Sequence, residues 1–144
     1  MSAAAKPLIS RRTIRVQWGE CDAAQIVYYP NFFIWFDECT GVLMEKAGLS
    51  QRAMTAAGGF GIPLVNAQAN FIIPSSHEDD LTAESWVERW GHKSFTVQHR
   101  LYKDGKLAVE GQETRILGGR HPEDPRRLVA MVIPAEMKDR FIER

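Results

Sequence analysis

The sequence predicts one α+β domain in which a curved antiparallel sheet wraps around a single long helix. Three observations lead to this fold class. Hydrophobic residues follow a helical period over about 17 residues from Pro30. The chain after residue 62 consists almost wholly of strand-like segments, and Asp104-Gly105, a strong hairpin signal, separates two of them. A sheet curved around one helix is the simplest way to bury the bulky apolar side of that helix.

The length and composition agree with one globular domain. The chain has 144 residues, of which 44% are hydrophobic and 25% are charged. It is too short for two full-sized domains and too apolar for a disordered chain. Because no repeat or low-complexity linker interrupts the sequence, we interpret residues 1–144 as a single domain.

The first predicted element is a strand with one face toward water. Residues 12–18 alternate, with Ile14, Val16 and Trp18 on one face and polar residues on the other. Residues 19–25 follow neither the strand nor the helix period, so we expect a loop there.

The long helix is predicted by apolar residues that recur at spacings of three and four. These residues are Phe32, Trp35, Phe36, Cys39, Val42, Leu43 and Ala47. Pro30 suits the first helical turn, where its missing N–H costs nothing, and Gly48 follows the helix end. Gly41 inside the helix costs about 1 kcal/mol relative to alanine. We therefore expect a neighbouring backbone to approach the helix closely at this glycine.

The remaining elements are short. Ser50 can cap a short helix that ends near the Gly-rich turn at 58–61. Strands are predicted at about 63–73, 81–90, 93–102, 106–118 and 127–133. Residues 118–127 are turn-rich and predict a long loop, and Pro134 opens a short C-terminal helix. An open sheet of this kind has an edge strand, which favours pairing with a second subunit.

Charge and composition exclude several classes of protein. Eighteen Lys+Arg balance eighteen Asp+Glu, and neither half of the chain has the basic excess that nucleic-acid binding requires. No apolar run approaches the roughly 20 residues that cross a bilayer. Two cysteines are too few for a disulfide scaffold, and the N-terminus lacks the apolar region of a signal peptide. We expect a soluble, cytoplasmic protein that binds neither nucleic acid nor membranes.

The sequence contains no familiar metal or nucleophile motif. Its four histidines, at 77, 92, 99 and 121, are not spaced as zinc ligands. Cys21 and Cys39 are better explained as small packing residues than as nucleophiles. A G-x-S-x-G elbow and a P-loop are both absent. We therefore expect no bound metal.

Asp22 is the strongest candidate for catalysis. It lies in the predicted loop among small and apolar residues, where partial desolvation makes a carboxylate a stronger base. The helix begins shortly after it, at Tyr29-Pro30, with unpaired N–H groups that suit a developing oxyanion. One carboxylate facing one such donor is the minimum arrangement for attack on an acyl carbonyl. The alternative is that Asp22 only caps a turn.

A second candidate is the turn that contains His92 and Lys93. Together with Arg89, these residues place cationic donors between two strands, where a phosphate can be held. An ordinary solvated turn explains the same residues equally well.

Two segments resemble a known family. The run WGECDAAQIVYYPNFFIWFDE at 18–38 resembles the hallmark segment of the 4-hydroxybenzoyl-CoA thioesterase family, whose members have the hot-dog fold. Residues 62–95 resemble the later strands of that family, and Lys93-Ser94-Phe95 matches its K-S-F turn. The resemblance covers roughly residues 10–135.

The resemblance implies a fold, an assembly and a reaction. The hot-dog fold is a long helix wrapped by an antiparallel sheet, and its members form dimers with a continuous sheet and often tetramers. Substrate lies at the subunit interface. Asp22 would attack the thioester carbonyl or activate water against it, while the backbone N–H of Tyr29 polarises that carbonyl. The resemblance implies no metal and no redox cofactor. Coenzyme A is part of the substrate and is the leaving group.

The resemblance also assigns binding residues. Asp37 matches a position that can meet an aryl hydroxyl, and Ile62 would line the acyl pocket. Basic residues around the K-S-F turn hold the coenzyme A phosphates, which points to Lys93 and His92. The chain departs from the best-known aromatic-CoA enzymes at four positions: it has Ala23 and Gln25 in place of Pro and Gly, and Gly91 and His92 in place of arginines.

Four functions follow as alternatives. The first is hydrolysis of aromatic acyl-CoA thioesters, and its close rival is hydrolysis of short-chain aliphatic ones. A hot-dog dehydratase is disfavoured because it relies on a histidine near an acidic residue of the helix, and no histidine precedes His77. The fourth is a non-catalytic module that binds acyl-CoA or an acyl carrier.

Overall fold

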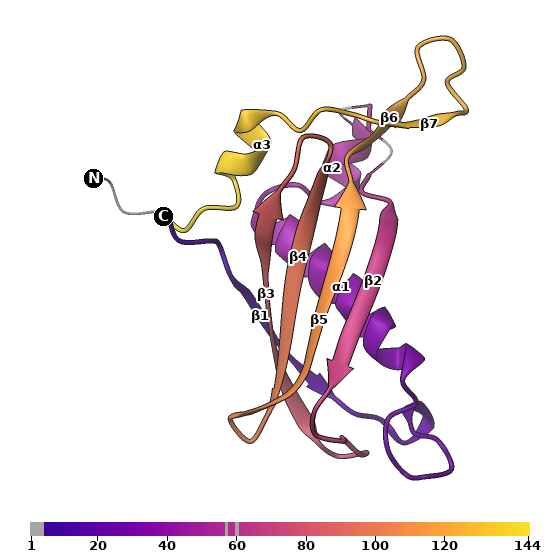
Figure 1. Cartoon of the computed structure of the whole chain (residues 1–144), viewed down its shortest axis with the longest axis vertical. Helices are drawn as coiled ribbons and strands as arrows, with labels where there is room; N and C mark the ends of the chain where they lie inside the picture. Colours follow the sequence, from indigo (N-terminus) through magenta and orange to yellow (C-terminus); the bar gives the residue numbers. More distant parts are fainter. Residues whose placement is uncertain (1–4, 57, 60) are drawn as a thin grey trace.

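The computed structural model describes residues 5–56, 58–59 and 61–144, and it confirms the predicted α+β architecture (Figure 1). A five-stranded antiparallel sheet, in the order β1-β3-β4-β5-β2, curves around one long helix, α1 (Pro30–Lys46). The strands of this sheet are β1 (Ser10–Arg15), β2 (Leu64–Phe71), β3 (Asp80–Trp90), β4 (Ser94–Lys103) and β5 (Lys106–Ile116). Within the described residues, no helix is both long enough and apolar enough to span a bilayer.

The other elements lie at the two ends of the sheet. They are a 3-10 turn η1 (Trp18–Glu20), the short helices α2 (Gln51–Ala56) and α3 (Ala135–Asp139), and the strands β6 (Gly118–Arg120) and β7 (Leu128–Ala130). Gly58 and Gly61 have positive φ angles, as turn glycines do, whereas residue 60 of the same predicted turn lies outside the described residues.

Two strand boundaries predicted from the sequence are wrong. β1 ends at Arg15, where its ladder with β3 ends, and Trp18 lies in η1 with 79% of its surface exposed. The predicted strand 106–118 divides at Leu117. The Leu117 N–H still donates to the Lys93 carbonyl in register with β4, but the Leu117 carbonyl accepts the N–H of Met131, so the chain changes partner there. β6 then pairs with β7 in a separate hairpin, so the predicted strand 127–133 does not join the main sheet.

The ends of α1 follow the predicted signals. Pro30 occupies the first turn, and Gly48 has a φ of 80° just past the end. The N–H groups of Gly48 and Leu49 donate to the carbonyls of Glu45 (2.9 Å) and Met44 (2.8 Å), which is the Schellman arrangement. The expected close approach at Gly41 is wrong within the described chain, since no atom lies within 4 Å of where its Cβ would stand.

The core lies between α1 and strands β1, β3 and β4. Phe36 and Leu43, two turns apart on α1, are fully buried there. By contrast, β2 at the sheet edge is exposed along almost its whole length, including Val65 (57%). Ile34, on the outer side of α1, is 54% exposed. The chain therefore leaves an apolar strip on the edge strand and the helix uncovered.

Candidate active site

Asp22 lies at the tip of a narrow hairpin between β1 and α1. An antiparallel bridge joins Cys21 to Val27, and the Asp22 N–H donates to the Ile26 carbonyl (2.9 Å). One carboxylate oxygen of Asp22 accepts the Ala24 N–H at 2.8 Å and so caps the turn. The other oxygen has no hydrogen bond to the described residues. The expected partial desolvation is wrong for the single chain, because Asp22 is exposed.

Glu20 fixes this hairpin against the first turns of α1. Its carbonyl accepts the Tyr28 N–H (2.8 Å) and the Asn31 side chain (2.9 Å). Its carboxylate accepts the indole N–H of Trp35 at 3.1 Å. The spacing between the Asp22 loop and the helix N-terminus is therefore set by four hydrogen-bonded residues and not by a flexible link.

Tyr29 stands at the start of α1, where the helix dipole is positive. Within the described chain its backbone N–H has no hydrogen-bond acceptor, whereas the N–H groups of Val27 and Tyr28 just before it are both paired. A free N–H at a helix N-terminus is suited to stabilise negative charge on a carbonyl oxygen.

Asp22 and Tyr29 line the same cavity of about 330 Å³. The remaining wall is mostly apolar and comes from the hairpin, α1, the end of β2 and the segment after it: Ile26, Val27, Phe32, Phe71, Ile72, Ile73, Pro74 and Ser75. The rings of Phe32 and Phe71 lie 5.2 Å apart between centroids. Among these described lining residues, Asp22 is the only one with a charged side chain. An apolar cleft with a few polar groups at one end is typical of small-molecule sites.

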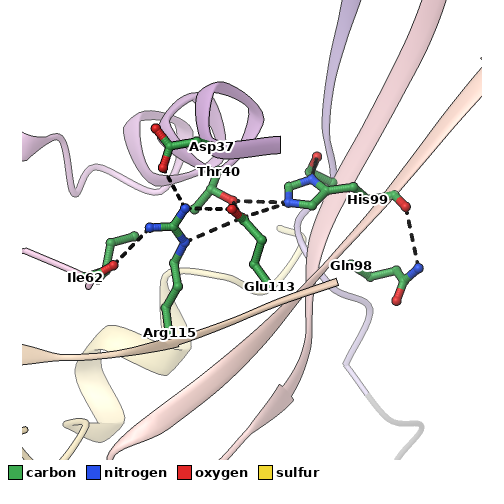
Figure 2. Close-up of polar contacts among 8 residues, drawn as sticks. Asp37, Thr40, Ile62, Gln98, His99, Glu113 and Arg115 are labelled. Carbon is green, nitrogen blue, oxygen red and sulfur yellow. Dashed lines mark hydrogen bonds and ion pairs between the residues drawn. The ribbon is translucent and has the colours of Figure 1, made fainter. Parts of the chain in front are cut away.

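Asp37 and Ile62 line a different cavity of about 360 Å³, farther along α1. Arg115 connects them: its guanidinium lies 2.7 Å from the Asp37 carboxylate and donates to the Ile62 carbonyl at 3.0 Å (Figure 2). Eight residues separate Tyr29 from Asp37, which is about 12 Å along a helix. Within one chain, Asp22 and Tyr29 therefore line one cavity, and Asp37 and Ile62 line another.

Behind Arg115, a polar cluster lies buried between α1 and the sheet (Figure 2). Arg115 contacts the Glu113 carboxylate at 2.7 Å, and His99 contacts the same carboxylate at 2.9 Å. Thr40 of α1 donates to Glu113, and Ser85 of β3 lies 2.7 Å from the other ring nitrogen of His99. Because His99 is fully buried, it cannot reach a substrate as a dehydratase histidine would.

Burial and hydrogen bonding have opposite effects on the pKa of Glu113. Burial alone raises the pKa of a carboxyl, but hydrogen bonds from His99, Arg115 and Thr40 outweigh it and lower the pKa of Glu113 to about 2. The Phe36 ring stacks on His99 at 5.0 Å between centroids, and Gly111 makes room for this ring because a Cβ there would lie 2.4 Å from it.

This buried cluster was not predicted from the sequence, although the strand period contained the signal. His99 has the same parity as the apolar residues Phe95, Val97 and Leu101, which are all buried on one face of β4. A histidine at such a position points into the core and requires buried partners.

His92 and Lys93 lie in the turn between β3 and β4, and both are exposed. The Asp22 loop is at the opposite end of the sheet, near the start of β3 (Figure 1). An 11-residue strand such as β3 spans about 35 Å. In one chain these two basic residues are therefore remote from Asp22.

Comparison with known proteins identifies the family of this chain. A sequence model of the thioesterase-like superfamily matches residues 16–140. The chain belongs to this superfamily. It is 31% identical over 129 residues to the 4-hydroxybenzoyl-CoA thioesterase of Pseudomonas sp. (strain CBS-3), a match that covers 85% of this chain and 89% of that protein. A 1,4-dihydroxy-2-naphthoyl-CoA hydrolase of Prochlorococcus marinus (strain MIT 9515) is 26% identical over 110 residues, with 73% and 72% of the two chains covered.

Solved structures agree with the sequence relatives. This chain superposes on the Pseudomonas 4-hydroxybenzoyl-CoA thioesterase with a TM-score of 0.83 and 29% identity, and the match covers 92% of this chain and 99% of that one. A gentisyl-coenzyme A thioesterase gives a TM-score of 0.78 at 26% identity, with 90% and 99% covered. The fold is therefore the hot-dog fold, and the thioesterase is an acyl-CoA thioester hydrolase.

Proposed function

We propose that this thioesterase hydrolyses aromatic acyl-CoA thioesters of the benzoyl or hydroxybenzoyl type to the free acid and coenzyme A. The observation that carries the proposal is one cavity that combines the Asp22 carboxylate, the free N–H of Tyr29 and a wall formed by Phe32 and Phe71. The names of its relatives specify 4-hydroxybenzoyl-, 1,4-dihydroxy-2-naphthoyl- and gentisyl-coenzyme A, and each of these carries an aromatic acyl group.

The chemistry needs only a base or nucleophile and an oxyanion donor. Asp22 either attacks the thioester carbonyl to form a mixed anhydride, which water then hydrolyses to the free acid and the regenerated carboxylate, or takes a proton from a water molecule that attacks instead. In both routes the carbonyl oxygen gains negative charge and accepts the N–H of Tyr29, and coenzyme A leaves as the thiol. The reaction involves no net oxidation or reduction, so no redox cofactor belongs to the proposal, and neither does a metal.

We further propose that the enzyme works as a homodimer that assembles into a homotetramer. In one chain, Asp22 and Tyr29 line one cavity while Asp37 and Ile62 line another. The edge strand β2 and the adjoining face of α1 carry exposed apolar side chains, which a second subunit would cover by adding a strand. Pairing at this edge would complete the acyl site between the subunits.

The proposed dimer gives each predicted binding residue a role. Asp37, held by Arg115, would meet a hydroxyl group of the acyl ring, and Ile62 would provide an apolar wall. The exposed turn with His92 and Lys93 would hold the coenzyme A phosphates. The two cysteines are free, which agrees with a cytoplasmic location.

A panel of coenzyme A thioesters tests the substrate class. Thiol release would be measured with benzoyl-, 4-hydroxybenzoyl-, acetyl- and butyryl-CoA at matched concentrations. The proposal predicts that kcat/KM for the aromatic substrates exceeds that for the aliphatic ones by about tenfold or more. Equal rates across the panel would contradict the aromatic preference and favour a short-chain aliphatic or unselective thioesterase. Binding without thiol release would favour a non-catalytic module.

A further inference from the structure

Among the described α-helices, Gly41 is the one glycine in a helix interior. Glycine is one of the least favourable residues there, because it loses the most conformational freedom on folding. Gly48 at the helix end has a positive φ, but Gly41 does not. A Cβ on Gly111 would lie 2.4 Å from the Phe36 ring, whereas a Cβ on Gly41 would have no atom within 4 Å. Neither the backbone conformation nor the packing of the described chain therefore requires glycine at position 41.

Gly41 is exposed, and it lines the same cavity as Asp37 and Ile62. The volume of this cavity, about 360 Å³, is within the range of small-molecule sites. Asp37 precedes Gly41 by four residues, so the two positions are neighbours on one face of α1. A side chain on a helix leans toward the helix N-terminus and covers the preceding turn. A side chain at position 41 would therefore extend over the turn that carries Asp37 and would fill part of the cavity.

The Asp37 carboxylate is held from below and is accessible from above. One of its oxygens accepts an N–H of Arg115 at 2.7 Å, and Glu113 binds the same guanidinium from inside the core at 2.7 Å (Figure 2). The other Asp37 oxygen has no hydrogen bond to the described residues, and 72% of the side chain is exposed. An anionic acceptor with a free oxygen suits a hydroxyl donor on a ligand that reaches it. The absence of a side chain at Gly41 leaves this approach open.

We propose that Gly41 determines which acyl groups this thioesterase accepts, because its missing side chain keeps the Asp37 end of the acyl pocket open for a ring. The inference rests on the proposed function, in which this cavity becomes part of the acyl site. A hydroxylated aromatic acyl group occupies the space beside Gly41 and places its hydroxyl against Asp37. An acetyl group ends where such a ring would begin, so it does not use that space. Position 41 therefore acts on substrate selection and takes no part in the chemical step.

This role predicts opposite effects of Gly41 substitutions on stability and on activity. Alanine and leucine are better helix formers than glycine, so Gly41→Ala and Gly41→Leu should keep the Tm or raise it. Both should impair aromatic substrates, leucine more than alanine, because each added carbon takes space from the ring. Glu38→Leu is the matched control, because Glu38 is also exposed on α1 but does not line this cavity.

The test measures kcat/KM with 4-hydroxybenzoyl-CoA and with acetyl-CoA, together with the Tm and the mass from light scattering, for the wild type and the three variants. The decisive quantity is the ratio of the two kcat/KM values, aromatic over acetyl. We expect Gly41→Leu to lower this ratio by about tenfold or more and Gly41→Ala to lower it by about fivefold. Glu38→Leu should keep the ratio within about twofold of the wild type. If the leucine variant does not fold, the ratio for Gly41→Ala decides in the same direction.

Two results would overturn the inference. One is a ratio for the folded Gly41 variants within about twofold of the wild type. The other is a lower mass for Gly41→Ala with equal losses on both substrates, which would assign the space beside Gly41 to a second subunit instead of the acyl group. A wild-type enzyme that releases no thiol from any thioester would instead overturn the proposed function itself, so the two failures are distinguishable.

Discussion

Replacing Glu113 with glutamine should destabilise the protein in a way that depends on pH. Glu113 is 2% exposed, and its hydrogen bonds hold its pKa at about 2 instead of the ordinary 4.5. A pKa lowered from 4.5 to about 2 corresponds to about 3 kcal/mol of folding free energy at neutral pH. Glu113→Gln removes this charge and leaves Arg115 with only the exposed Asp37 as its ion-pair partner, so a loss of about 3 kcal/mol is expected at pH 7.

The sign of the pH dependence follows from the direction of the shift. Because the folded pKa lies below the unfolded one, the stabilisation by Glu113 is complete above about pH 4.5 and is lost as the pH falls toward 2. By pH 3 the wild type should have lost about 2 kcal/mol from this group. The glutamine variant has no carboxyl to titrate there, so its stability should fall by about 2 kcal/mol less over the same range.

Urea unfolding at pH 7, 5, 4 and 3, at one fixed protein concentration, measures both effects. Glu110→Gln is the control, because Glu110 lies on the same strand but faces outward and is only partly buried. A difference of less than about 0.5 kcal/mol between the two variants at pH 7 would contradict the stabilising role of Glu113. Equal losses of unfolding free energy by wild type and Glu113→Gln between pH 7 and pH 3 would contradict it as well.

Three further predictions concern packing and assembly. Gly111→Ala should lower stability by about 1–3 kcal/mol, because its Cβ would lie 2.4 Å from the Phe36 ring, and an unchanged Tm would contradict this. Burial raises the pKa of the Cys39 thiol to about 11, so a thiol reagent at pH 8 should label at most one cysteine quickly in the folded protein, and two fast thiols would oppose this reasoning. Ile34→Glu should convert the proposed dimer to a monomer in light scattering and lower activity by about tenfold or more, while Thr82→Glu on the exposed face of β3 should do neither. An intact, active Ile34→Glu dimer would exclude this face from the proposed interface.

Much of the fold could be predicted because its signals are local. The apolar period from Pro30 and the glycine at 48 gave α1 with both ends correct, and Asp104-Gly105 gave the β4–β5 turn, where both residues have positive φ. Asp22 and Tyr29 are only seven positions apart, so their common cavity also follows from a short stretch of sequence.

The features that could not be predicted depend on contacts between distant segments. Arg115 meets Asp37 across 78 positions, and only the register of β5 beneath α1 brings them together. β1 ends where its ladder with β3 ends, although the alternation continues to Val16, which is still buried. The cost of Gly41 has no explanation within one chain, because nothing lies near it.

The most direct test of the central claim is the turnover of Asp22→Asn on 4-hydroxybenzoyl-CoA. Asparagine keeps a side-chain oxygen that can accept the Ala24 N–H, so the turn and the Tm should be preserved. Loss of a general base or nucleophile should lower kcat by about 100-fold or more. A folded Asp22→Asn protein that releases coenzyme A at the wild-type rate would contradict the assignment of this cavity as the active site.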